Sequence, residues 1–269
     1  MVKTVWPGTP ETGVPGHTKN PNSLARCFFM KGSLLYEGKA KRVYYTTGDS
    51  DQLVLSYKDD ATAFNGKKKD EFAGKGRLNN LITSKVFQYL HQQNIQTHFI
   101  EALNDTEQLV HQTTIIPLEV VVRNQAAGSI TRRLGIQEKN SFTPPIIELF
   151  YKKDELNDPL INDVHAYHLT DITEQELTFI KQQALEINSQ LQELFHSAGL
   201  ILVDFKLEFG RLNDGAIVLS DEISPDTCRL WDTHTGEKMD KDVFREGLGS
   251  LIDTYEKILN RLEENVCTK

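Results

Sequence analysis

Long apolar runs and cysteine pairs are both missing from this sequence of 269 residues. No stretch approaches the roughly 18 apolar residues that a membrane-spanning helix needs, and the N-terminus lacks a basic region followed by an apolar run. The three cysteines, Cys27, Cys228 and Cys267, are far apart and have no CxxC or Cys/His spacing suited to zinc. We therefore expect a cytoplasmic protein that has neither disulfides nor a membrane anchor.

Basic charge is also in deficit. Lysine and arginine total 30 residues against 38 aspartates and glutamates, which gives a formal net charge of -8. A general nucleic-acid binder usually needs excess basic residues to displace phosphate counterions, so nucleic acid is not an expected partner. Neither standard phosphate loop is present, because no Walker A or GxGxxG pattern follows a strand. A small phosphorylated ligand remains compatible, since it needs only a few basic groups at one site.

The residue patterns divide the chain into three parts. Residues 1–29 contain four prolines and three glycines and show no periodicity, so we expect a loosely packed extension, with Met30 as an alternative start. Residues 30–117 favour a lobe made mainly of strands. Residues 118–269 favour a second lobe that is richer in helix.

In the first lobe, residues 34–45 and 52–57 predict the two strands of a β-hairpin. Lys39 and Lys41 are two positions apart in the first of these strands, so they should share one face. The preceding Gly38 would let a ligand approach the backbone. This geometry suits phosphate oxygens, although a solvated lysine edge that discourages strand pairing is an equally good interpretation.

In the second lobe, Thr173 and Glu176 form a capping-box pattern at the start of a helix. Apolar residues then recur at steps of three and four until Gly199 ends the helix. Residues 244–262 follow the same periodicity and predict one further amphipathic helix near the C-terminus.

Two further segments could bind an anion at a helix N-terminus. Gly74-Lys75-Gly76 precedes a predicted helix, which is a weak signal. Arg123 directly follows an apolar strand, and Ser129 could cap a short helix after it. Backbone N–H groups, a hydroxyl and a guanidinium would then all donate to a phosphate monoester. Arg132 and Arg133 are better interpreted as surface charges.

Residues 202–209, LVDFKLEF, alternate strictly between apolar and polar side chains. Such a strand would bury Val203, Phe205, Leu207 and Phe209 on one face. Its other face would present Asp204, Lys206 and Glu208 to a cleft. An ordinary half-exposed strand would show the same alternation.

The strand is followed by a hairpin signal at Asn213-Asp214-Gly215. If Asp214 and Gly215 form a two-residue loop, Glu208 lies opposite Asp221 with Cβ atoms roughly 5 Å apart. Two carboxylates at that distance favour a shared cation, and magnesium prefers one or two protein carboxylates. A bulge or a different register would separate the pair.

Five segments in series resemble the SAICAR synthetase family, from about Leu35 to Leu262: LYEGKAKRVY, KGRLNN, PLEVVVRNQAAGS, LILVDFKLEFG and DEISPDTCRLWD. The resemblance implies an α/β (α+β) fold of the two-lobed ATP-grasp or kinase-like type. An N-terminal antiparallel β lobe and a larger mixed α/β lobe would hold ATP between them. It further implies an ATP- and Mg²⁺-dependent ligase that joins L-aspartate to a carboxylated aminoimidazole ribonucleotide, and a homodimer or higher assembly.

The resemblance also implies a role for individual residues. Those expected at ATP are Lys39, Lys41, Val43, Ile115, Ile116, Glu119 and Lys152. Those expected at the ribonucleotide or aspartate are Arg123, Ser129, Asp158, Lys206 and Arg229. Catalytic roles fall to Lys206, Asp204 and Lys41, and the magnesium ligands would be Glu208 and Asp221.

Two rival functions remain compatible with lysines, paired carboxylates and a cleft. One is another ATP-grasp ligase or a small-molecule kinase, although no sequence like the protein-kinase HRD or DFG motif is present. The other is a non-catalytic nucleotide-binding regulator. The retained Lys41, Lys206, Glu208, Asp221 and Arg229 argue against a regulator.

Overall fold

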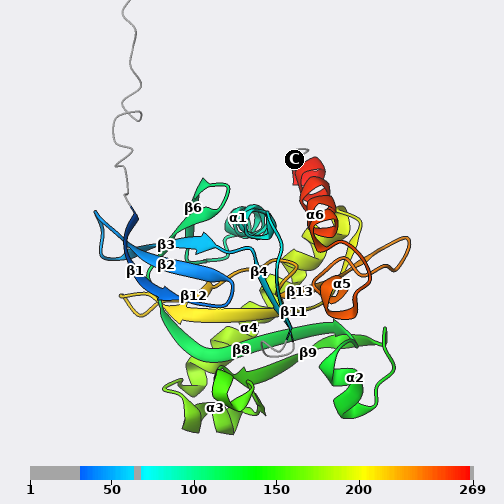
Figure 1. Ribbon diagram of the computed structural model, residues 1–269. Helices are drawn as coiled ribbons and strands as arrows, with labels where there is room; N and C mark the ends of the chain where they lie inside the picture. The colour runs from blue at the N-terminus through cyan, green and yellow to red at the C-terminus, as the bar shows by residue number, and fades with distance from the viewer. Residues whose placement is uncertain (1–30, 64–67, 267–269) are drawn as a thin grey trace, which may run out of the picture.

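The computed structural model describes residues 31–63 and 68–266, and within them two antiparallel sheets dominate (Figure 1). The smaller sheet has the order β1 (Lys31–Glu37), β2 (Lys41–Thr46), β3 (Gln52–Tyr57), β7 (Glu107–His111), β6 (Phe99–Asn104). The larger has the order β10 (Leu160–Ile161), β9 (Ser141–Tyr151), β8 (Thr114–Gln125), β11 (Leu200–Arg211), β12 (Ile217–Ser220), and β13 (Cys228–Asp232) also pairs with β11. A separate ribbon is formed by β4 (Asp60–Ala63) and β5 (Lys68–Glu71).

In the part of the chain that the structure describes, three long helices pack around these sheets. The helix α1 (Lys75–Gln92) contacts the smaller sheet and also α6 (Leu251–Val266), which lies beside it in Figure 1. The helix α4 (Glu174–Ser197) packs on β8 and β11 of the larger sheet. Shorter helical segments are α2 (Ser129–Leu134), α3 (Asp163–Leu169), α5 (Asp242–Glu246) and a 3₁₀ turn at Asp154–Leu156. In the described part of the chain, no helix has the length and apolar character needed to cross a bilayer.

One apolar core joins both halves of the chain. Buried side chains from α1, β8, α4, β11 and α6 meet in it, among them Ile82, Val120, Ile187, Phe205 and Tyr255. Because this core crosses residue 117, the division into two lobes at that point stays a prediction. The prediction for residues 1–29 falls outside the described residues.

The predicted first strand, residues 34–45, is in fact two strands. The chain reverses at Gly38-Lys39-Ala40, where the Gly38 N–H donates to the Lys41 carbonyl oxygen at 2.8 Å, and β1 pairs antiparallel with β2. The predicted hairpin between β2 and β3 is confirmed. Lys39 therefore lies in a turn and Lys41 begins a strand, so the prediction that they share one strand face was wrong.

The capping box at α4 is confirmed, and its side chains bond reciprocally. The Glu176 N–H donates to Thr173 Oγ1 at 3.2 Å, and the Thr173 N–H donates to Glu176 Oε2 at 2.8 Å. The single C-terminal helix predicted over residues 244–262 is instead α5 and α6. Gly247 adopts φ of 70° after α5, which breaks the helix and lets the chain restart at α6.

The alternation along β11 also breaks at one point. The pairing with β13 shifts between Leu202 and Asp204, which leaves Val203 without a partner position. Val203 consequently packs with Ala127 and Trp231, not with Phe205 in the main core. The prediction that Val203 shares a face with Phe205 was wrong, because a bulge adds one residue to the strand.

The N-terminus of α1 is occupied by the chain's own carboxylate. Asp59 accepts the Gly74 N–H at 3.1 Å and the Gly76 N–H at 2.8 Å. Gly76 also packs closely on β3, since a Cβ there would lie 2.8 Å from the Tyr57 carbonyl oxygen. The weak anion-site signal at this helix is thus explained by an internal cap.

Candidate functional site

A cleft of about 620 Å³ is lined by residues from both sheets. Its apolar half is the inner face of the smaller sheet, where Val43, Leu53, Leu55 and Val110 pack together. Ile115, at the start of β8, contributes to the same lining and is 37% exposed. A flat apolar group such as a purine base would fit this half.

The polar half of the cleft begins with Lys41. Its Nζ donates to Asp221 Oδ1 at 2.5 Å and to Glu222 Oε1 at 3.1 Å. Burial alone would lower the pKa of Lys41, but the two carboxylates outweigh burial and raise it well above its ordinary value. Lys41 therefore presents a fixed positive charge to the cleft.

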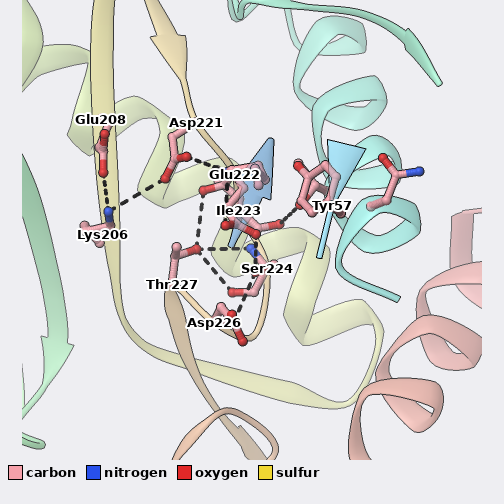
Figure 2. A network of polar contacts seen from close by, with 12 residues as sticks. Tyr57, Lys206, Glu208, Asp221, Glu222, Ile223, Ser224, Asp226 and Thr227 are labelled. Carbon is pink, nitrogen blue, oxygen red and sulfur yellow. Dashed lines mark hydrogen bonds and ion pairs between the residues drawn. The ribbon is translucent and has the colours of Figure 1, made fainter. Parts of the chain in front are cut away.

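Lys206 belongs to the polar half of the cleft, and Figure 2 shows it between Glu208 and Asp221. Its ammonium group contacts Glu208, lies 3.2 Å from Glu119 Oε1 and lies 3.7 Å from Asp221 Oδ2. Burial opposes the charge of Lys206, but these carboxylates raise its pKa well above the ordinary value. A lysine in this state donates hydrogen bonds and neutralises negative charge, and it is a poor proton acceptor.

Further charged groups continue around the rim. Lys152 contacts the buried Glu208 from the end of β9. Lys39 reaches across from the smaller sheet, and its Nζ donates to Asp154 Oδ1 at 2.7 Å. Asp158 also lines the cleft, and its Oδ1 accepts the Lys153 N–H at 2.9 Å.

The register of the β11–β12 hairpin differs from the prediction by one residue. Glu208 pairs with Ser220, and the Leu212 N–H donates to the Ala216 carbonyl oxygen at 2.8 Å, so the loop has three residues. Asp221 lies just beyond the pair and has a left-handed backbone with φ of 64°. The predicted cross-strand pairing of Glu208 with Asp221 was wrong.

The two carboxylates nevertheless converge on one cationic atom, Lys206 Nζ, to which dashed lines join both of them in Figure 2. A small cation bound by both carboxylates would lie close to the present position of the Lys206 ammonium group. No group of three or more His, Cys, Asp or Glu side chains that could hold a metal occurs among residues 31–63 and 68–266. Two carboxylates fit magnesium, which takes its remaining ligands from phosphate oxygens and water.

A second polar cluster lies further along β11, around Asp204. Arg123 Nη1 donates to Asp204 Oδ2 at 2.6 Å, and Arg229 Nη1 donates to the same oxygen at 2.9 Å. Arg123 Nη2 also donates to Ser129 Oγ at 3.2 Å. The structure therefore brings together the three residues that were expected to hold a phosphate, Arg123, Ser129 and Arg229.

Gly128 allows the Arg229 guanidinium to approach the backbone closely. It has φ of 63°, and a Cβ at this position would lie 2.5 Å from Arg229 Nη2. Only glycine leaves room for the guanidinium beside the start of α2. Gly128, not Ser129, is the N-cap residue of α2, so the expected capping role of Ser129 was wrong.

Most of the other expected residues line the cleft, but one does not. Lys39, Lys41, Val43, Ile115, Glu119, Lys152, Asp158, Lys206, Glu208 and Asp221 all contribute to its lining. Ile116 is 1% exposed and packs in the main core, because successive residues of β8 point to opposite faces. His98, Glu222, Asp226 and Lys241 also line the cleft and were not singled out from the sequence. Asp226 lies in the conspicuous segment SPDTCRLWD, whereas nothing near His98 signals a site.

Comparisons with known proteins identify one family. A family model described as SAICAR synthetase matches residues 34–262. The phosphoribosylaminoimidazole-succinocarboxamide synthase of Oceanobacillus iheyensis is 67% identical over 237 residues, which cover 88% of this chain and 100% of the relative. The corresponding enzyme of Anoxybacillus flavithermus is 57% identical over 239 residues, covering 89% of this chain and 99% of the relative.

Solved structures give the same result. A SAICAR synthetase in complex with ADP has a TM-score of 0.81 at 48% identity, covering 84% of this chain and 96% of that one. The phosphoribosylaminoimidazole-succinocarboxamide synthase of Ehrlichia chaffeensis has a TM-score of 0.83 at 46% identity, covering 86% and 98%. The expected mixed α/β fold of the ATP-grasp-like type is confirmed. With its cleft between two antiparallel sheets and the family match over most of its length, the chain belongs to the SAICAR synthetase family.

Proposed function

We propose that this chain joins L-aspartate to the carboxylate of a carboxylated aminoimidazole ribonucleotide, with conversion of ATP to ADP and phosphate. The observation that carries the proposal is the polar face of β11. Glu208 and Lys206 on this face belong to the cleft, and Asp204 belongs to the arginine cluster. Positions 204 and 208 of a strand are roughly 13 Å apart, so one extended face serves both a nucleotide and a second phosphorylated ligand.

The nucleotide half of the proposal rests on the cleft lining. The apolar surface around Val43 and Ile115 would border adenine. Lys39, Lys41 and Lys152 lie toward the polar half, where they would meet the phosphate chain. The solved relative that contains ADP supports this assignment.

Glu208 and Asp221 would hold magnesium, since both contact the same ammonium group and both line the cleft. When bound, magnesium would offset negative charge on the phosphate oxygens. The raised pKa of Lys206 keeps its side chain charged. Lys206 can then exchange its contact with Glu208 or Asp221 for one with a reacting oxygen.

The second substrate would bind toward Asp204. Arg123, Ser129 and Arg229 would hold its phosphate by charge-assisted hydrogen bonds, which are stronger than neutral ones. Asp204 accepts from both arginines and keeps their guanidinium groups in place. Its oxygens are thereby engaged, which suits positioning of the substrate better than proton transfer.

The chemistry follows from the position of Lys206 between these regions. A carboxylate is a poor electrophile, so transfer of the γ-phosphoryl group to the imidazole carboxylate would activate it, and the aspartate amine would then displace phosphate. Lys206 and Lys41 would neutralise the charge that develops on the transferred group. The protein contributes mainly alignment and electrostatic stabilisation. A cytoplasmic location and a homodimer stay predictions.

A coupled assay of ADP release tests the proposal. We expect ADP release only when both L-aspartate and the ribonucleotide are present, with the succinocarboxamide as product. Asp221→Asn should reduce kcat by roughly 100-fold or more, because losing a metal ligand removes several kcal/mol of charge stabilisation. Asp163→Asn, at a surface aspartate paired with Lys181, is the matched control and should leave kcat unchanged.

The outcomes separate the rival functions. ADP release with the ribonucleotide alone would indicate a kinase, and nucleotide binding without turnover would indicate a regulator. Full activity of Asp221→Asn at limiting magnesium would contradict the assignment of the metal site.

A further inference from the structure

Asp221 adopts a backbone conformation that needs support. Its φ of 64° lies in the left-handed region, which is unfavourable for a residue with a Cβ. In the right-handed region its side chain would leave the cleft in a different direction. Its contacts with Lys41 and Lys206 therefore depend on this strained conformation.

One side chain bonds the backbone of this residue directly. His98 Nε2 lies 3.1 Å from the Asp221 carbonyl oxygen. A carbonyl oxygen only accepts hydrogen bonds, so Nε2 must carry the proton and donate it. The bond thus fixes both the tautomer of His98 and the direction of the Asp221 carbonyl group.

His98 is itself held firmly. Its N–H donates to the Leu219 carbonyl oxygen at 2.8 Å, and its carbonyl oxygen accepts the His111 N–H at 2.7 Å. These bonds tie the residue to the larger and the smaller sheet at once. The residue is only 5% exposed. Its imidazole ring packs edge-on against Phe87, with ring centroids 5.8 Å apart.

We propose that His98 is a positioning residue that holds Asp221 in its left-handed conformation and so aims the Asp221 carboxylate at the metal and phosphate site. The proposal rests on the proposed function in one respect, that Asp221 is a magnesium ligand. The hydrogen bond from His98 acts on the backbone of that ligand, as outer partners of metal ligands commonly do.

The test compares two substitutions whose side chains have equal length. His98→Gln keeps an N–H donor at the end of the side chain, whereas His98→Met has a similar shape and no donor. Mn²⁺ binding in the presence of ADP, followed by electron paramagnetic resonance, reports the site without turnover. Removing an outer partner of a metal ligand typically weakens metal binding by about 10–100-fold. We expect that loss in His98→Met, and an affinity close to that of the wild type in His98→Gln.

His91→Met is the matched control. His91 Nε2 lies 2.7 Å from Thr97 Oγ1, and His91 does not touch Asp221. The His91→Met variant therefore also loses a histidine hydrogen bond, but not one to the proposed metal ligand. It should retain wild-type Mn²⁺ affinity. His98→Phe provides a second donor-free variant should His98→Met fail to fold.

A further readout distinguishes positioning from general destabilisation. In an Asp221→Asn background, His98→Met should weaken Mn²⁺ binding no further, because the ligand on which it acts is already lost. Equal affinities of His98→Met, His98→Phe and the wild type would overturn the proposal, as would equal losses in His98→Met and His91→Met. Absence of wild-type ADP release would instead contradict the proposed function, and the Mn²⁺ comparison would still decide the role of His98.

Discussion

At the scale of residues, the cleft is an arrangement of charges that neutralise one another. Lys41 is paired with Asp221 and Glu222, and Lys206 with Glu208 and Asp221. A buried charge without a partner is strongly destabilising, so these pairs allow several charged groups to share one partly desolvated site. Incoming phosphates and a cation would exchange partners with groups that are already charged and in place.

Arg229 illustrates how much depends on side-chain shape. Its Nε donates to Asp242 at 2.8 Å while its Nη1 donates to Asp204 at 2.9 Å. Lysine cannot make both bonds from one planar group. Losing one charge-assisted hydrogen bond costs about 1.5–3 kcal/mol. We therefore expect Arg229→Lys to raise the KM for the ribonucleotide by about 10-fold or more, with little change for ATP, in steady-state assays.

The control is Arg77→Lys, at an exposed arginine whose Nε donates to Asp105 at 3.0 Å. It should change neither KM. An equal rise of both KM values in Arg229→Lys would contradict a role of Arg229 at the ribonucleotide alone.

At the scale of elements, β11 organises the site because it pairs with β8, β12 and β13. Its alternation was evident in the sequence and correctly placed Asp204, Lys206 and Glu208 on one side. The bulge at Val203 and the three-residue loop at Asn213-Asp214-Gly215 were not predicted. Both depend on how neighbouring strands align, which local residue preferences do not determine.

The helix α4 supplies a test at this scale. Thr173 Oγ1 and the Glu176 carboxylate satisfy N–H groups that would otherwise lack partners at the helix start. Thr173→Ala should reduce the free energy of unfolding by about 1 kcal/mol, measured by urea denaturation. Ser197→Ala, which removes only a hydroxyl bonded to the Leu194 carbonyl oxygen, should cost less. Equal losses in the two variants would contradict the importance of the capping box.

At the scale of the whole molecule, the cleft lies between the two sheets. The apolar side chains of β2, β3 and β7 line it, whereas most of those of β8 and β11 pack in the main core. The family match begins at residue 34, and the Oceanobacillus iheyensis relative is covered in full by 237 residues. We therefore expect a variant that starts at Met30 to keep the kcat, both KM values and the thermal unfolding midpoint of the full chain. Loss of activity on this truncation would show that residues 1–29 contribute to the enzyme.

Sequence patterns alone identified the family, the antiparallel and helical character of the two halves, and most of the charged residues in the cleft. These follow from local alternation, capping patterns and motifs in series, which depend on residues close together in the chain. Which partners these charges meet depends on how the sheets pack in three dimensions. The turn at Gly38 sends Lys39 to Asp154 and Lys41 to Asp221, and the shifted hairpin register leaves Asp221 to be held by His98. Such pairings join residues more than a hundred positions apart, so they arise only when the sheets pack together.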